Sequence, residues 1–322
     1  MNTIFNKRSL VRAVSSAVSV SVIVGAGLLS GCTIKESSST NVSTALQTNV
    51  TTVQEDKNIK VMADFKTLMG KGPKAEVLIT FIDLNISNVS KENASMMVTS
   101  LEEIQKKGLP KLDEKYYNGE TIQNKMSKVY KPGFDLNKLE DILDKELKDL
   151  LLETRDAGYR VETAEGMYFP IINYEFHKKY SMYVTLDIKN YIEIMAVESN
   201  KVPAKDAALM IGWDEVINRA LTQEKFIRDH GSSSKASEMR QLLKKYLTFT
   251  LFGANNTPLF SYDSKIMVPD AKTTYLNAMK DNGDSKLIQV LRNYTDLLSK
   301  TNYKLTDAVD KFRKDAVEST TF

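Results

Sequence analysis

The chain has 322 residues, with 44 Lys and Arg against 41 Asp and Glu and a formal net charge of +3 at pH 7. Three of these bases, Lys7, Arg8 and Arg12, lie in the first 31 residues, where no acidic residue occurs, so the rest of the chain is balanced. A balanced chain lacks the positive excess that neutralises phosphates, which argues against nucleic acid as a partner. With only 14 glycines and seven prolines, the composition favours helices joined by short links over β-meanders.

The N-terminus has the three parts of an export signal. A short stretch with the three bases precedes a mostly apolar run over residues 13–29, which ends in small residues. The run is shorter than the roughly 20 apolar residues of a membrane span and is interrupted by serines. The sequence therefore predicts a cleaved signal rather than a permanent transmembrane helix.

The end of this run, Leu29-Ser30-Gly31-Cys32, resembles the lipobox of bacterial prolipoproteins. The resemblance covers the first 32 residues. It implies a diacylglyceryl group on Cys32, cleavage between Gly31 and Cys32, and a lipid-anchored location on the extracytoplasmic face of a bacterial membrane. Two acyl chains hold a protein durably at a bilayer, and no other cofactor is expected. Because Cys32 is the only cysteine, we expect neither a disulfide nor a thiol nucleophile in the exported part.

We expect three parts along the chain. Residues 1–31 are the signal peptide, and residues 32–57 are the lipidated cysteine and a flexible polar tether, whose few apolar side chains cannot offset the cost of ordering. Residues 58–322 form a mostly helical body that is long enough for a sizeable core. An internal boundary in this body would fall near residues 131–134 or 231–234, where Pro, Gly and Ser gather.

Apolar periodicity and capping residues predict a mainly α fold, a helical bundle or helical array with up to two short strands. Helix starts are expected, in chain order, at Ser90, Thr121, Asp135, Pro203, Ser234, Pro269, Asp284 or Ser285, and Thr306. Gly108 and Pro110 are expected to end the first of these helices, and Gly253 the one from Ser234. The clearest apolar stripe covers residues 136–151.

Two segments are ambiguous. Residues 182–189 alternate as in a strand, but an apolar pattern that continues from Tyr180 to Met195 favours a helix. Residues 76–86 leave strand and helix both open.

An aromatic enrichment is the one local candidate for a binding surface. Eight Tyr and Phe residues lie between Tyr159 and Tyr191, and Tyr suits sugar stacking or a protein interface. A core layer is the alternative. The candidate contact residues are Tyr174, His177, Tyr180, Tyr183 and Tyr191.

Motifs for catalysis or metal binding are missing from the sequence. The two histidines, His177 and His230, belong to no His-Glu-x-x-His pattern, and Gly-x-Ser-x-Gly does not occur. We therefore expect no metal site and no enzyme, but a membrane-anchored, non-enzymatic binding or interaction module of the cell envelope, with an envelope protein as partner. The alternatives are a lipoprotein that captures a small-molecule ligand for a transporter or sensor, and a cell-wall hydrolase.

Overall fold

The computed structural model describes residues 41–117, 120–131, 133–280 and 283–322, with side chains from Glu55 onward except that of Glu120. Gly31, Cys32 and the predicted signal peptide lie outside the described residues. Residues 49–322 form one compact unit, which includes both positions considered for an internal boundary. This unit has its own hydrophobic core, running from Phe65 to Ala316, which is the condition for folding alone.

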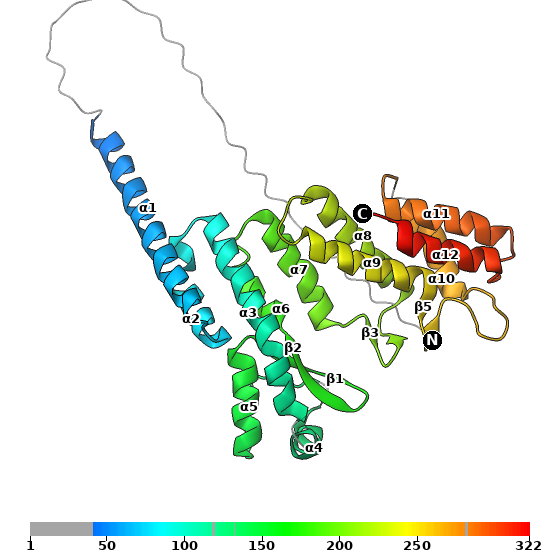
Figure 1. The fold of residues 1–322 in the computed structure, drawn as a ribbon, viewed down its shortest axis with the longest axis horizontal. Helices are drawn as coiled ribbons and strands as arrows, with labels where there is room; N and C mark the ends of the chain where they lie inside the picture. The colour runs from blue at the N-terminus through cyan, green and yellow to red at the C-terminus, as the bar shows by residue number, and fades with distance from the viewer. Residues whose placement is uncertain (1–40, 118–119, 132, 281–282) are drawn as a thin grey trace, which may run out of the picture. The chain divides into compact units, whose positions relative to one another are not determined.

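The described part of the chain is mainly α, which confirms the predicted fold class (Figure 1). Its first half contains α1 (Asn41–Gly70), α2 (Ala75–Asn85), α3 (Lys91–Tyr117), α4 (Glu120–Val129), α5 (Lys145–Asp156), and the strands β1 (Tyr159–Ala164) and β2 (Met167–Ile172). Its second half contains α6 (Tyr174–His177), α7 (Leu186–Asn200), α8 (Trp213–Asp229), α9 (Ala236–Phe252), α10 (Pro269–Ala278), α11 (Lys286–Ser299) and α12 (Asp307–Ser319). Two-residue strands pair as β3 (Ala204–Lys205) with β4 (Ala208–Leu209), and β5 (Gly253–Ala254) with β6 (Thr257–Pro258).

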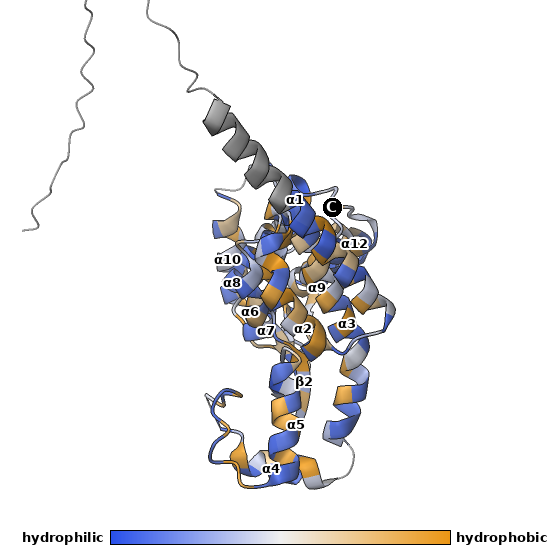
Figure 2. Cartoon of the chain, turned by 90° about the vertical axis from the view of Figure 1, so that its left-hand side faces the viewer, coloured by the Kyte–Doolittle hydropathy of each residue, from blue (hydrophilic) through white to orange (hydrophobic). Residues whose placement is uncertain are grey.

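Two helices organise the packing. Helix α3 contacts α2, α4 and β2, whereas α8 contacts α7, α9, α10 and α11. The described helices bury apolar side chains on the faces that meet the core. Helix α5, for example, buries Leu147, Leu150 and Leu151, and Figure 2 shows hydrophobic and hydrophilic residues alternating along it. Such a face is what an amphipathic helix needs to pack against a core.

The ambiguous segment at residues 76–86 is helical. Helix α2 buries Ala75, Leu78, Ile79 and Ile82. These positions are three or four residues apart and therefore lie on one helix face.

The favoured helix at residues 180–195 is confirmed only in part. Helix α7 begins at Leu186, and the residues before it form the single turn α6, a 3₁₀ turn (Lys178–Tyr180) and a bend. Tyr180 ends this 3₁₀ turn, and its hydroxyl donates to Asp83 on α2 at 2.8 Å. The alternation in residues 182–185 therefore belongs to neither a strand nor a helix.

Three other sequence predictions about helices are wrong. Residues 135–144 form turns, and α5 begins only after Asp144, which accepts from the backbone N–H of Leu147 at 2.9 Å. Pro203 does not start a helix, because residues 204–209 form the β3–β4 hairpin and α8 begins at Trp213. Residues 41–57, predicted as part of a flexible tether, are helical in α1.

Helix α3 passes through both residues that were expected to end it, Gly108 and Pro110. The reason lies outside the helix. A Cβ on Gly108 would meet the hydroxyl of Tyr159 at 3.0 Å, and this hydroxyl donates to the backbone carbonyl of Gln105 at 2.7 Å. Glycine therefore leaves room for a tertiary hydrogen bond that joins β1 to this part of the helix.

The β1–β2 hairpin was missed by the sequence analysis. Its register pairs Ala164 with Met167, so the turn residues are Glu165 and Gly166, and both have positive φ. Two residues with positive φ form the turn type that fits the twist of a hairpin. The sequence signal for it is the Glu-Gly pair between two segments rich in β-branched and aromatic residues.

The predicted starts of the last helices are confirmed. Pro269 is the first residue of α10, Ser285 caps α11 by accepting from Ile288 N–H at 3.0 Å, and Thr306 caps α12. Helix α11 also has a second cap that sequence analysis did not find. The buried carboxylate of Glu224 on α8 accepts from the backbone N–H groups of Lys286 at 2.6 Å and Leu287 at 3.2 Å.

Replacing Glu224 by Ala is expected to lower the free energy of unfolding by about 2 kcal/mol, because the first N–H groups of α11 lose a buried, charged acceptor. Urea unfolding of the two proteins measures this change. Glu193→Ala, which removes an exposed carboxylate from α7, is the matched control and should change stability by less than about 0.5 kcal/mol. Equal effects of the two substitutions would contradict the capping role.

Candidate functional site

A cluster of charged and phenolic side chains lies where α3, α6, α7 and α9 meet, partly buried and partly open to solvent. We call it the Glu102 cluster, and its members are Glu102, Lys106, Tyr174, Tyr191, Lys235 and Glu238. The side chains of Glu102 and Lys235 are 3% and 4% exposed, and their charged atoms lie 2.6 Å apart. Such deep burial of two charges is tolerated only when each is paired and hydrogen-bonded.

Each charge of the Glu102 cluster has its partner inside the cluster. Lys106 and Lys235 both contact Glu102 and Glu238, at distances of 2.6–2.9 Å. The hydroxyls of Tyr174 and Tyr191 each donate to Glu102 at 2.6 Å. Two carboxylates and two ammonium groups therefore balance within the cluster, and Glu103 lies 3.8 Å from Lys235 beside it.

The electrostatics of Glu102 exclude it as a proton donor near neutral pH. Burial alone would raise its pKa, but the charge and hydrogen bond of Lys235, with hydrogen bonds from Tyr174 and Tyr191, outweigh burial and lower the pKa to about 2. Burial raises the pKa of Tyr174 and of Tyr191 well above the usual phenol value. A charged carboxylate held by neutral phenols joins the helices that meet at this cluster.

The structure places four of the five candidate contact residues in the interior. Tyr174 and Tyr191 belong to the Glu102 cluster, Tyr180 bonds to Asp83, and His177 is 1% exposed. Tyr183 is half-buried against the core. This burial corrects the expectation of an aromatic contact surface, because the hydroxyls that would face a partner are bound to carboxylates of this chain. Cys32 and Gly31, the predicted lipidation and cleavage residues, lie outside the described part.

His177 completes a second buried hydrogen-bond chain beside the Glu102 cluster. Its Nε2 lies 2.8 Å from Gln105 Oε1, and the Gln105 amide donates to the carbonyls of Ala157 and Gly158. Burial, the largest influence, lowers the pKa of His177 to about 4. The imidazole is therefore neutral at pH 7, and it is buried like the apolar side chains of the core.

Acid should destabilise the protein through His177. The unfolded state binds a proton near pH 6.5 and the folded state only near pH 4, so stability is lost as pH falls through this window. Between pH 7 and pH 5 this loss amounts to about 2 kcal/mol, measured as the fall in the free energy of unfolding in urea.

The comparison that isolates this effect uses His177→Gln and His230→Gln at both pH values. His177→Gln should remove most of the loss, and His230→Gln should retain it. Glu198, whose pKa is raised by burial, acts in the opposite sense but is common to all three proteins. An unchanged loss in His177→Gln would contradict the assignment.

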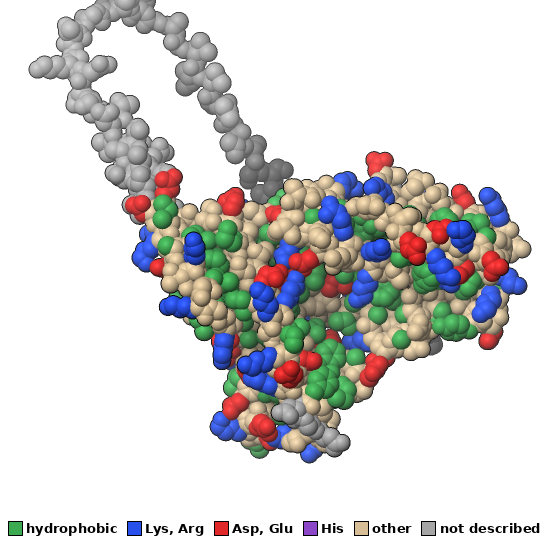
Figure 3. Space-filling model, viewed as in Figure 1, with side chains coloured by type: hydrophobic (Ala, Val, Ile, Leu, Met, Phe, Trp, Pro, Cys, Tyr) green, Lys and Arg blue, Asp and Glu red, His purple; other side chains and the backbone are tan. Residues whose placement is uncertain are grey.

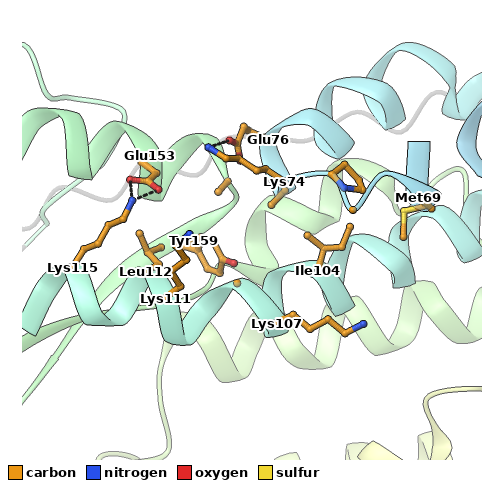
Figure 4. Close-up of a pocket in the computed structure, with 15 residues that line it drawn as sticks. Met69, Lys74, Glu76, Ile104, Lys107, Lys111, Leu112, Lys115, Glu153 and Tyr159 are labelled. Atoms are coloured by element: carbon orange, nitrogen blue, oxygen red, sulfur yellow. Dashed lines mark hydrogen bonds and ion pairs between the residues drawn. The ribbon is translucent and has the colours of Figure 1, made fainter. Parts of the chain in front are cut away.

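A cavity of about 490 Å³ lies beside these clusters, between the segment that joins α1 to α2, helix α3 and the start of β1. We call it the lysine-lined cavity. Its charged residues are Lys74, Glu76, Lys107, Lys111, Lys115 and Glu153, and its apolar wall includes Met69, Ile104, Leu112 and Tyr159. Figure 4 shows the three lysines of α3 along one side and Lys74 with Glu76 across from them.

The lysines of this cavity differ in their partners. Lys115 pairs with Glu153 at 2.5 Å, and Lys74 lies 3.7 Å from Glu76. Neither Lys107 nor Lys111 has a hydrogen-bond or ion-pair partner among the described residues. The cavity therefore has a net positive lining and two cations free to pair with a ligand.

A second, larger cavity of about 980 Å³ lies next to the first and shares Glu76 and Tyr159 with it. It has an aromatic wall of Tyr130, Phe134 and Phe176. Several of its charges are already paired, as in Arg155 with Asp156 at 2.8 Å and Lys179 with Asp83 at 2.9 Å.

The lysine-lined cavity was not predicted from the sequence. The available signal was the spacing of Lys107, Lys111 and Lys115, which places three like charges on one helix face. The face opposite them, around Lys74, is brought there only by the turn between α1 and α2.

No group of three or more His, Cys, Asp or Glu side chains among the described residues is arranged to hold a metal ion. Among the described helices, none combines the length and apolarity needed to cross a bilayer. Comparison of the chain with protein-family models, with curated proteins and with solved structures finds no match.

Proposed function

We propose that this protein is a membrane-anchored extracytoplasmic lipoprotein whose folded body binds another component of the bacterial cell envelope without transforming it. The anchor rests on one observation, the sequence Leu29-Ser30-Gly31-Cys32 at the end of a basic start and an apolar run. The diacylglyceryl group on Cys32 provides two acyl chains, which suffice for durable attachment.

The binding function of the body is supported by its charged groups. Glu102 is buried, paired and kept charged inside its cluster, whereas the unpaired lysines lie at the surface around a cavity. Elsewhere the charges are balanced, and Figure 3 shows basic and acidic side chains interspersed over the visible face. An open cavity with free cations suits recognition more than proton transfer.

The proposed partner is an envelope protein or a small ligand. Balanced surface charge and the absence of a catalytic motif in the sequence support a protein partner. The lysine-lined cavity favours a second candidate function, capture of a small ligand for a transporter or sensor, because its volume lies within the range of roughly 300–1,000 Å³ typical of small-molecule sites.

Metabolic labelling with a palmitate analogue tests the anchor. The wild-type protein should take up label and migrate at mature size with the membrane fraction, and Cys32→Ala should remain unlabelled at precursor size. Ser30→Ala keeps a lipobox of the same family and is the matched control. Label on Cys32→Ala, or its migration at mature size, would refute the anchor.

Lysine-directed cross-linking on intact cells, followed by mass spectrometry, tests the protein partner. One dominant protein joined to the body would support the interaction module. Absence of any partner above background would leave ligand capture as the remaining binding function and refute the protein partner.

A further inference from the structure

We infer that the lysine-lined cavity binds a small molecule with an anionic head, a carboxylate or a phosphate, on an apolar body. The inference deepens the proposed binding function and rests on it for its setting in the cell envelope. Three independent features of the cavity support it: its apolar wall, its unpaired lysines and its position at the start of α2.

The wall of the cavity is suited to an apolar group. Met69 from α1, Ile104 and Leu112 from α3, and the ring of Tyr159 from β1 face a space of about 490 Å³. Gly108 lies in the same wall and adds no side chain. Apolar wall area in contact with water is a source of binding free energy when a ligand covers it.

The rim of the cavity is suited to an anion. Lys107, Lys111 and Lys115 follow one another at intervals of four residues, and like charges at this spacing weaken a helix. Only Lys115 has a partner, Glu153, among the described residues. The row therefore carries a like-charge arrangement that the fold relieves only at Lys115, and an anionic ligand would relieve it at Lys107 and Lys111.

Lys74 adds to this positive rim from the other side. It precedes α2 in an extended conformation, and its side chain does not cap the helix. This end of α2 has N–H groups without a helical acceptor and the positive end of the helix dipole near the cavity, with Glu76 as the one carboxylate of the first turn. Lysine reaches a ligand through four rotatable bonds, so Lys107, whose amino group extends outward in Figure 4, can turn toward an anionic head.

The neighbouring cavity also has an apolar wall, but no unpaired lysine lines it among the described residues. Two of its cations, Arg155 and Lys179, already pair with Asp156 and Asp83. An anion there would compete with carboxylates at 2.8–2.9 Å. The same ligand should therefore bind more tightly in the lysine-lined cavity than in the neighbouring one.

Isothermal titration calorimetry with three octyl compounds tests the inference. The protein is the chain from Thr33, which lacks signal and lipid and retains every described residue, after far-UV circular dichroism has shown its helices. Octanoate and octyl phosphate supply the two anionic heads, and octan-1-ol supplies the same apolar body without charge. At least one of the two anions should bind about tenfold more tightly than the alcohol.

The variant Lys107→Glu/Lys111→Glu should weaken binding of the anions by about tenfold or more and change that of octan-1-ol little. The matched control, Lys244→Glu/Lys300→Glu, makes the same charge change at exposed lysines outside the cavity and should leave all three unchanged. Binding of one anion alone supports the inference and identifies the head group. The inference is overturned if neither anion binds, if the alcohol binds as tightly, or if the control pair weakens the anions equally. These results are independent of palmitate labelling, so the calorimetry and the labelling test the ligand site and the lipid anchor separately.

Discussion

Replacing Glu102 by Gln is expected to lower the free energy of unfolding by about 3–5 kcal/mol, the usual cost of removing one partner from a buried ion pair. Lys235, 4% exposed and 2.6 Å from Glu102, would be left with Glu238 as its close counter-charge. The hydroxyl of Tyr174 would also lose its charged acceptor, and that of Tyr191 would keep only Glu238, at 2.9 Å. Urea unfolding at pH 7 measures the change.

Glu103→Gln is the matched control for this substitution. Its carboxylate is half-exposed and 3.8 Å from Lys235, so its loss should cost less than about 1 kcal/mol. The double variant Glu102→Gln/Lys235→Met removes both charges and should be more stable than the sum of the two single changes predicts. Additive effects would show that the two charges do not stabilise each other.

Replacing Gly158 by Ala is expected to cost about 3 kcal/mol or more, because backbone strain and a steric clash act together. Gly158 has a φ of +76°, and a Cβ there would lie 2.4 Å from the amide nitrogen of Gln105. Moving Gln105 breaks its bonds to Ala157 and Gly158 and disturbs its bond to His177. Thermal and urea unfolding both report the loss.

Gly166 separates the two contributions. It has a similar φ of +74°, and a Cβ there would meet nothing within 4 Å. Gly166→Ala should therefore cost only the backbone strain, about 1 kcal/mol. If both substitutions cost the same, the close approach to Gln105 would contribute nothing to stability.

In the aromatic segment, residue type alone did not predict the environment of the side chains. From the sequence, Tyr174 and Tyr191 were candidate contact residues because phenol rings with hydroxyls suit an interface. Their hydroxyls meet Glu102, which lies 72 and 89 residues earlier in the chain. Whether such a hydroxyl faces a partner or a carboxylate of its own chain depends on which helix packs beside it.

The lysine-lined cavity illustrates the same limit. The row of lysines on α3 is visible in the sequence, but a row of charges on a helix is also what a solvated surface has. Lys74 and Met69 come from segments that precede α3 in the chain, and they become the opposite wall only after α1, α2 and α3 have packed. The cavity was therefore beyond prediction from helical periodicity.

The sequence by itself determined the mainly α class and the helix starts at Pro269, Ser285 and Thr306. These features depend on groups within about four residues of one another, such as a hydroxyl and the N–H three positions later. The same local information supports the proposed signal and lipobox, which occupy one continuous stretch.

Tertiary structure alone decided the continuation of α3 through Gly108 and Pro110, the turns at residues 135–144, and the burial of His177. In each place the local preference is weak compared with the free energy of packing. Leu136, Leu139 and Ile142 are buried although they are not in a helix. The hydrophobic free energy depends on the apolar area removed from water, and it does not require a particular backbone conformation. Gly108 stays helical because Tyr159, 51 positions later, fills the space that its missing side chain leaves.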